Sequence, residues 1–142
     1  MPETDLVFQS ARDLASMLQQ RQISAREVMS AHYDQIERVN PTINAIVSGL
    51  PREAALDLAD AADAIGPGPD QPLFGLPIAF KDLEDAVGFP NTAGSPIYKD
   101  FRPEVDSAIV ERLRQAGVIP IGKTNVPEFG LGSHTYNPVF GP

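Results

Sequence analysis

The chain carries an uninterrupted apolar run, Val118-Ile119-Pro120-Ile121, near its C-terminal end. A run without polar alternation is typical of a strand that is buried on both faces, as in parallel sheets covered by helices. Directly before it, residues 107–116 have the apolar spacing of a helix, with Asp106 placed to cap its start and Gly117 to cap its end. A helix that leads into a strand buried on both faces indicates an α/β fold.

The rest of the chain predicts more elements of both kinds. Ile78-Ala79-Phe80 and residues 43–47 are short and apolar, so we expect two further strands. Pro41 should end a helix at Asn40, because a proline pushes the residue before it out of the helical region. The other helices are expected after Ser10, from Ser24 with Glu27 as a capping box, and from Pro51 to Ile65.

The helix expected after Pro51 has two chemically different faces. Asp57, Asp60 and Asp63 recur every three residues, which predicts a solvated face. The side chains that we expect to face the core are Ala54, Leu58, Ala61, Ala62 and Ile65. The fold class that follows is α/β, with helices packed on a mixed, partly parallel sheet, a helical part over 1–41 and an α/β part over 42–142.

Composition excludes several classes of function. Eleven basic and nineteen acidic residues give a formal charge of −8, which disfavours direct binding to nucleic acid or to an anionic membrane. No run approaches the roughly 20 apolar residues of a membrane span, and residues 1–5 lack the features of a secretory signal, so we expect a cytoplasmic protein. The chain has no cysteine, only two isolated histidines and no glycine-rich phosphate loop, so neither a metal site nor a cofactor is predicted.

Lys81 directly follows the predicted strand Ile78-Ala79-Phe80. Ligands in open α/β sheets bind at the carboxyl ends of strands, and a lysine that is neutral can take a proton from a hydroxyl group. The local sequence alone favours a different interpretation, in which Lys81 reaches solvent or pairs with Asp82, Glu84 or Asp85. One lysine therefore does not identify a chemistry.

Three motifs together identify a family. They are Gly75-Leu76-Pro77-Ile78-Ala79-Phe80-Lys81-Asp82, Thr92-Ala93-Gly94-Ser95, and the run from Gly122-Lys123-Thr124-Asn125 to Gly132-Ser133. In this order and spacing they resemble the amidase signature family of serine hydrolases. The resemblance implies that Lys81 is the base of a Ser–cis-Ser–Lys triad, which activates the nucleophilic serine through a bridging serine.

The resemblance also implies that both serines of the triad belong downstream of the segment Asn137-Pro138-Val139-Phe140-Gly141-Pro142, on which the chain ends. We therefore expect residues 1–142 to be the N-terminal portion of an amidase domain, with the remainder of the catalytic domain absent. No residue is assigned as nucleophile, bridging serine or oxyanion hole. The 142-residue chain is expected to be inactive by itself.

Other polar residues are weaker candidates. Ser95 and Ser133 are expected in loops and not as nucleophiles, and Lys123 is expected at the surface. Three residues that follow the third strand are candidates for substrate binding, although the first two are equally suited to capping a short helix near Pro127: Thr124, Asn125 and Glu128.

The leading hypothesis is an amidase that cleaves a small-molecule carboxamide through an acyl-serine intermediate. Within the family, the alternative is the glutaminase component of an aminoacyl-tRNA amidotransferase, which supplies ammonia to a partner. From a different class, the chain could be a non-catalytic module. A thin sheet with an exposed edge favours pairing with another copy, so a homo-oligomer is one expectation.

Overall fold

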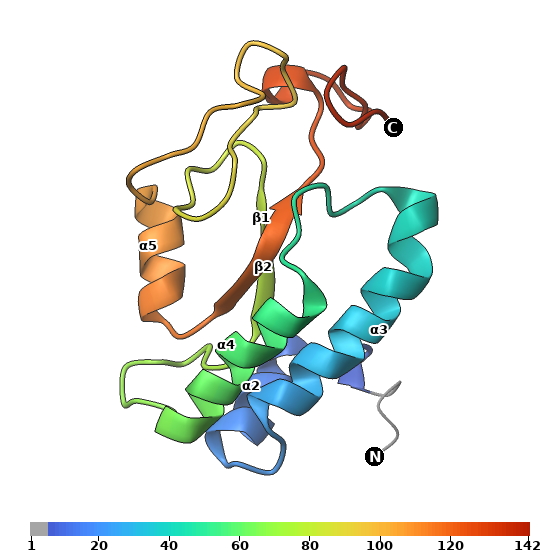
Figure 1. Cartoon of the computed structure of the whole chain (residues 1–142). Helices are drawn as coiled ribbons and strands as arrows, with labels where there is room; N and C mark the ends of the chain where they lie inside the picture. The colour runs from blue at the N-terminus through green and yellow to red at the C-terminus, as the bar shows by residue number, and fades with distance from the viewer. Residues whose placement is uncertain (1–5) are drawn as a thin grey trace. The chain divides into compact units, whose positions relative to one another are not determined.

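The computed structural model describes residues 6–142 (Figure 1). The acidic residues 1–5, on which the expectation about a signal sequence partly depended, lie outside the described residues. The chain divides into two compact units, each assembled from three separate segments. The segments of the first unit are 6–39, 50–78 and 113–121, and those of the second are 40–49, 79–112 and 122–142.

Helices dominate the first unit, and their starts follow the predicted caps. α2 is Ala11–Gln19, and the Ser10 side chain accepts a hydrogen bond from Asp13 N. α3, which extends into the second unit, is Ala25–Ile43. Before it, Glu27 N donates to Ser24 Oγ and Ser24 N donates to Glu27 Oε2. This reciprocal pair is a capping box, which confirms the prediction from sequence.

α4 is Arg52–Ile65, and it presents a different face to the core from the one predicted. Its buried residues are Ala55, Leu56 and Ala59, whereas Leu58 is 45% exposed and Ile65 is 84% exposed. The Asp63 carboxylate accepts hydrogen bonds from Ala25 N and Arg26 N, at 2.7 and 3.0 Å. Asp63 thus satisfies free N–H groups at the start of α3, and this contact fixes the rotation of α4 about its axis. The prediction that Asp57, Asp60 and Asp63 form a solvated face is therefore wrong at Asp63.

Two strands pair in parallel, and each begins in the first unit and ends in the second. β1 is Pro77–Lys81 and β2 is Ile119–Thr124, and both strands were predicted. In β2 every residue but the last is buried, as the continuous apolar run indicated. Leu76 O accepts from Ile119 N at the start of the pair, and Thr124 O accepts from Asp82 N at its end.

The segment before α4 departs from the prediction. Pro41 lies inside α3, which continues to Ile43, and residues 43–47 form no regular strand but a single antiparallel bridge between Ile46 and Thr124. The Asn40 side chain pairs with Ile46 in both directions, accepting from Ile46 N at 2.8 Å and donating to Ile46 O at 2.9 Å. These two bonds satisfy the backbone groups that a regular strand would have paired with its neighbours.

The last helices are short. α5 is Ala108–Gln115, close to the predicted helix over 107–116, and a 3-10 helix, η1, is Glu128–Gly130, where a brief helix was expected.

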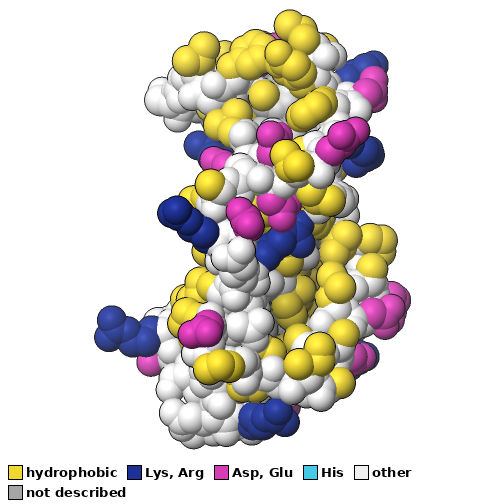
Figure 2. Space-filling view, turned by 90° about the vertical axis from the view of Figure 1, so that its left-hand side faces the viewer, with side chains coloured by type: hydrophobic (Ala, Val, Ile, Leu, Met, Phe, Trp, Pro, Cys, Tyr) yellow, Lys and Arg dark blue, Asp and Glu magenta, His cyan; other side chains and the backbone are white. Residues whose placement is uncertain are grey.

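Figure 2 shows hydrophobic side chains gathered over the loops of the second unit. Exposed large side chains of these loops include Ile97, Val105, Leu131 and Tyr136. Among residues 6–142, no helix has both the length and the apolar character that crossing a membrane would require.

Candidate active site

Lys81 is the last residue of β1, and its side chain is exposed. The chain turns immediately after it, because Glu84 N donates a hydrogen bond of 2.9 Å to Lys81 O. The local sequence had favoured this exposed position for Lys81. A cationic side chain is thus presented at the carboxyl end of a strand, which is where ligands of α/β sheets bind.

Asp82, the next residue, is completely buried. Its Oδ1 accepts a hydrogen bond of 3.0 Å from Thr92 N, and its Oδ2 accepts one from Thr92 Oγ1. Gly94 N donates to the same hydroxyl oxygen at 3.0 Å. The carboxylate of Asp82 therefore fastens the Thr92-Ala93-Gly94-Ser95 motif to the end of β1.

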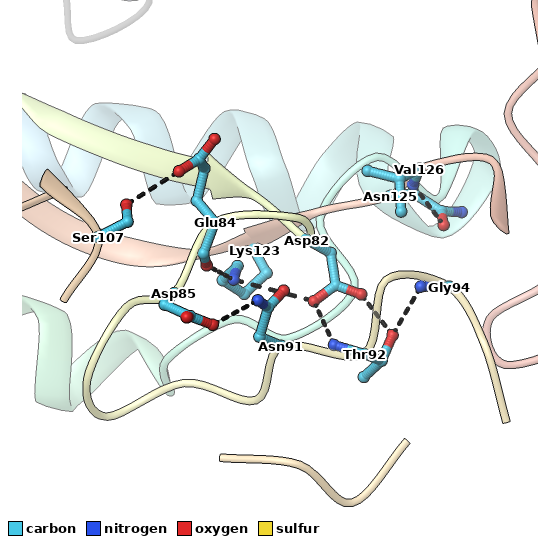
Figure 3. A network of polar contacts seen from close by, with 10 residues as sticks. All are labelled: Asp82, Glu84, Asp85, Asn91, Thr92, Gly94, Ser107, Lys123, Asn125 and Val126. Atoms are coloured by element: carbon cyan, nitrogen blue, oxygen red, sulfur yellow. Dashed lines mark hydrogen bonds and ion pairs between the residues drawn. The ribbon is translucent and has the colours of Figure 1, made fainter. Parts of the chain in front are cut away.

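Lys123, predicted at the surface, has 0% of its side chain exposed. Its Nζ donates to the main-chain oxygen of Glu84 and lies 3.9 Å from Asp82 Oδ1 (Figure 3). Burial lowers the pKa of the Lys123 ammonium, while the negative charges of Asp82, Asp85 and Glu84 oppose that shift. The prediction failed because β2 continues past the apolar run Val118–Ile121 to Thr124, and Lys123 is buried with the rest of the strand.

The loop after Lys81 is held by a second set of polar contacts (Figure 3). Ser107 Oγ donates to Glu84 Oε2 at 2.9 Å, and Ser107 N donates to Asp85 O at 2.8 Å. Asn91 Nδ2 donates to Asp85 Oδ1 at 2.6 Å. Three stretches of the segment 79–112, at residues 84–85, 91 and 107, therefore meet around one turn.

The three candidates for substrate binding do not share one pocket. Thr124 and Asn125 line a pocket of about 300 Å³. Glu128 lines a different pocket of about 490 Å³, together with Phe129 and Tyr136. Asn125 Oδ1 accepts from Val126 N at 3.0 Å and from Asn137 Nδ2 at 2.7 Å, so its side chain already has structural partners.

The two serines named as unsuitable nucleophiles lie in different surroundings. Ser95 is buried, its N donates to Thr92 O at 2.9 Å, and its Oγ accepts from Ile97 N at 3.4 Å. Ser133 is exposed. Over residues 6–142 no group of three or more His, Asp or Glu side chains is arranged to hold a metal ion.

Sequence reasoning missed the buried partners of this site, which are Asp82, Thr92 and Lys123. One signal could have found Lys123: it follows the apolar run Val118–Ile121 by only two residues, and a strand covered on both faces buries every residue along its length. The arrangement that results is an exposed lysine at the end of β1, beside a buried aspartate and a buried lysine.

The family model named Amidase matches residues 27–142, which include all of these residues. The chain belongs to the amidase family.

Curated relatives of this amidase-family chain are much longer proteins. The A subunit of the glutamyl-tRNA(Gln) amidotransferase from Salinispora arenicola (strain CNS-205) is 45% identical over 141 residues, which cover 98% of this chain and 28% of that protein. The protein of the same name from Nitratidesulfovibrio vulgaris (strain DP4) is 42% identical over 125 residues, which cover 88% of this chain and 25% of that protein. The chain thus spans little more than a quarter of the length of these relatives.

Solved amidase structures have the same fold over this part of their chains. A 6-aminohexanoate cyclic dimer hydrolase complexed with substrate is 31% identical, with a TM-score of 0.81 over 96% of this chain and 27% of its own. The peptide amidase of Stenotrophomonas maltophilia is 27% identical, with a TM-score of 0.79 over 93% of this chain and 28% of its own. The described residues therefore form part of the amidase signature fold.

Proposed function

We propose that the chain is part of an amidase-family hydrolase that cleaves carboxamide bonds through an acyl-serine intermediate, with Lys81 as the general base. The observation that carries the proposal is the match of the Amidase family model to residues 27–142, within which the motif lysine stands exposed at the end of β1. A base must come within hydrogen-bond reach of the proton that it removes, and an exposed strand end allows such an approach.

In the proposed reaction, neutral Lys81 takes a proton from the hydroxyl of a serine through a bridging serine. The serine oxygen attacks the carboxamide carbon, and the C–N bond breaks as the nitrogen takes a proton and leaves as ammonia or an amine. Water then attacks the acyl-serine ester and releases the acid. By resemblance, neither serine lies within residues 1–142, so the chain by itself is expected to be inactive.

A second candidate function is that of the glutaminase component, the A subunit, in an aminoacyl-tRNA amidotransferase. It is favoured by the curated relatives, because glutamyl-tRNA(Gln) amidotransferase A subunits of several bacteria are 39–45% identical to this chain. In this case the amide would be glutamine, and the ammonia would pass to a partner protein. The formal charge of −8 is compatible with this function if the partner holds the tRNA.

A third candidate, a non-catalytic module that self-associates, is favoured by the exposed apolar side chains over the loops of the second unit (Figure 2). Sedimentation of the isolated chain tests it. A monomer of 15.3 kDa at all concentrations would contradict self-association, whereas a concentration-dependent dimer would support it.

The proposed role of Lys81 can be tested in a chimera. Residues 1–142 replace the matching segment of the Salinispora arenicola relative, which is 45% identical to them. Lys81→Met is expected to lower amide hydrolysis by about a thousandfold, the order of magnitude lost with a general base. The matched control is Lys99→Met, which removes an exposed lysine outside the motif and should leave hydrolysis within about twofold of the parent.

Two outcomes would contradict the proposal. One is a Lys81→Met chimera that hydrolyses amides as fast as its parent. The other is a parent chimera that unfolds cooperatively, and is therefore folded, but has no amidase activity. Comparing glutamine with simple aliphatic amides, in the complete reading frame that contains this chain, separates the first two candidate functions.

A further inference from the structure

The chain has only three lysines, and two of them lie in the candidate active site in opposite surroundings. Lys81 is exposed at the end of β1, whereas Lys123 on β2 has no exposed surface. Lysine is rarely buried, because removing an ammonium from water is costly unless partners compensate for the lost hydration. The contacts of Lys123 indicate which part of the site its buried ammonium stabilises.

Lys123 contacts the turn that follows Lys81 at two points. Its Nζ donates to the main-chain oxygen of Glu84, at the far end of the turn, and lies 3.9 Å from Asp82 Oδ1, near its start. The same turn is closed by the bond of 2.9 Å from Glu84 N to Lys81 O. Figure 3 shows the Lys123 ammonium directed between Glu84 and Asp82.

The backbone on both sides of these contacts is also fixed. Lys123 O accepts a hydrogen bond of 3.0 Å from Val47 N, and Lys123 N donates one of 3.1 Å to Ser48 O. Asp82 N donates to Thr124 O, the residue that follows Lys123. The Lys123 side chain therefore extends from a hydrogen-bonded strand to the turn after Lys81. We call these contacts of its ammonium with Glu84 and Asp82 the brace of that turn.

We infer that Lys123 is a positioning residue for Lys81: by holding Glu84 and Asp82 it fixes the turn that sets where the Lys81 side chain leaves β1. The inference rests on the proposed function for its catalytic consequence. A base that is misplaced by about 1 Å loses much of its effect, so bracing the backbone at Lys81 has a direct chemical benefit.

Nuclear magnetic resonance on the 142-residue chain tests the brace without any substrate. The chain is labelled with ¹³C at lysine Cε, which gives one signal for each of its three lysines, and with ¹⁵N at the backbone amides. Lys123→Met removes the ammonium but leaves the Asp82 carboxylate buried without its counter-ion. The decisive variant is therefore Lys123→Met combined with Asp82→Asn, compared with Asp82→Asn alone, because only Lys123 differs between the two.

In the double variant we expect the Glu84 amide to exchange with solvent about tenfold faster than in Asp82→Asn alone, because the turn opens locally. The Lys81 Cε signal should also shift, while the Lys99 signal stays in place. If the folded double variant keeps both the Glu84 exchange rate and the Lys81 signal of Asp82→Asn, the inference is wrong. A residue that only stabilises the fold would change the unfolding midpoint without moving the Lys81 signal.

The wild-type chain provides a test that survives if the variants do not fold. As the pH is raised, the Glu84 amide signal should change together with the Lys123 Cε signal and not with the Cε signals of Lys81 and Lys99. A Glu84 amide that is unaffected while Lys123 loses its proton would overturn the inference.

The catalytic consequence has a separate readout in the chimera. The double variant should lower kcat by about tenfold relative to Asp82→Asn, with KM nearly unchanged, because positioning of the base acts on the chemical step. Equal kcat values would overturn this part of the inference. If instead Lys81→Met leaves the chimera active while the resonance results are as expected, the proposed function is wrong and the brace remains.

Discussion

The Nζ atom of Lys123 lies 3.9 Å from Oδ1 of Asp82, and neither side chain has any exposed surface. Removing a charge from water is costly, and a nearby opposite charge offsets that cost only where hydrogen bonds satisfy the remaining donors and acceptors. Thr92 supplies two of these bonds to Asp82, and the main-chain oxygen of Glu84 accepts one from Lys123. The ends of β1 and β2 are thus joined by a buried polar cluster.

Lys123→Met is expected to reduce the free energy of unfolding by about 3–5 kcal/mol, because it leaves the Asp82 carboxylate buried without a cation. Urea denaturation of the 142-residue chain measures the change. Lys99→Met, which removes an exposed lysine, should change the free energy of unfolding by less than about 0.5 kcal/mol. A Lys123→Met chain as stable as wild type would mean that this ion pair contributes nothing.

The strands were predictable because the apolar runs at Ile78–Phe80 and Val118–Ile121 leave little alternative to burial in a sheet. The burial of Lys123 was not predicted, because the contacts of its ammonium come from Asp82 and Glu84, some forty residues away in sequence. Local propensity places a lysine at the surface, and only the pairing of β1 with β2 brings its partners within reach. The position of Lys81 at the end of a strand was therefore predictable, and the burial of Lys123 was not.

The course of α3 shows a similar limit at shorter range. Pro41 was expected to end the helix at Asn40, but α3 continues to Ile43. The Asn40 amide pairs with both backbone groups of Ile46, six residues later, and this contact competes with the strand that the apolar residues predicted. Side-chain to backbone pairing of this kind leaves no periodic pattern in the sequence.

Thr92→Val should destabilise the chain by about 3 kcal/mol, because it removes a donor to the buried Asp82 carboxylate and the acceptor of Gly94 N. Thr92→Ser is the matched control, since it keeps the hydroxyl and loses only a methyl group, which should cost about 1 kcal/mol. Thermal unfolding of the two variants gives the difference. Equal losses would show that the hydroxyl bonds are not the source of the stability.

Gly117→Ala and Gly88→Ala separate backbone strain from steric contact, because both glycines have a φ of 95°. A Cβ at residue 117 would lie 2.8 Å from Phe74 Cα, whereas a Cβ at residue 88 would meet no atom within 4 Å. Both variants should lose about 1–2 kcal/mol from the unfavourable φ. Gly117→Ala should lose a further 1–3 kcal/mol, roughly, from overpacking. Unfolding free energies that match would contradict the close approach at Phe74.

Tyr33 should make the stability of the chain fall at alkaline pH. Its hydroxyl donates to Leu50 O at 3.0 Å, and its pKa is raised from 10.0 by burial and, to a lesser extent, by the negative charge of Glu37. A group whose pKa is higher in the folded state binds its proton more tightly there. Its contribution is therefore complete below the unfolded-state pKa and is lost as the pH rises through the folded-state pKa.

Tyr33→Phe removes this contribution and is the variant to compare with wild type. At neutral pH it should cost about 1 kcal/mol for the lost hydrogen bond to Leu50. Above about pH 10 the two unfolding free energies should converge, because wild type loses what the variant never had. The lowered pKa of Lys123 makes the stability of the chain increase as the pH rises, which is the opposite trend. Because Lys123 is present in both chains, its contribution cancels in the difference. Urea denaturation at a series of pH values gives both curves, and curves that stay parallel would show that Tyr33 titrates alike in the folded and unfolded chains.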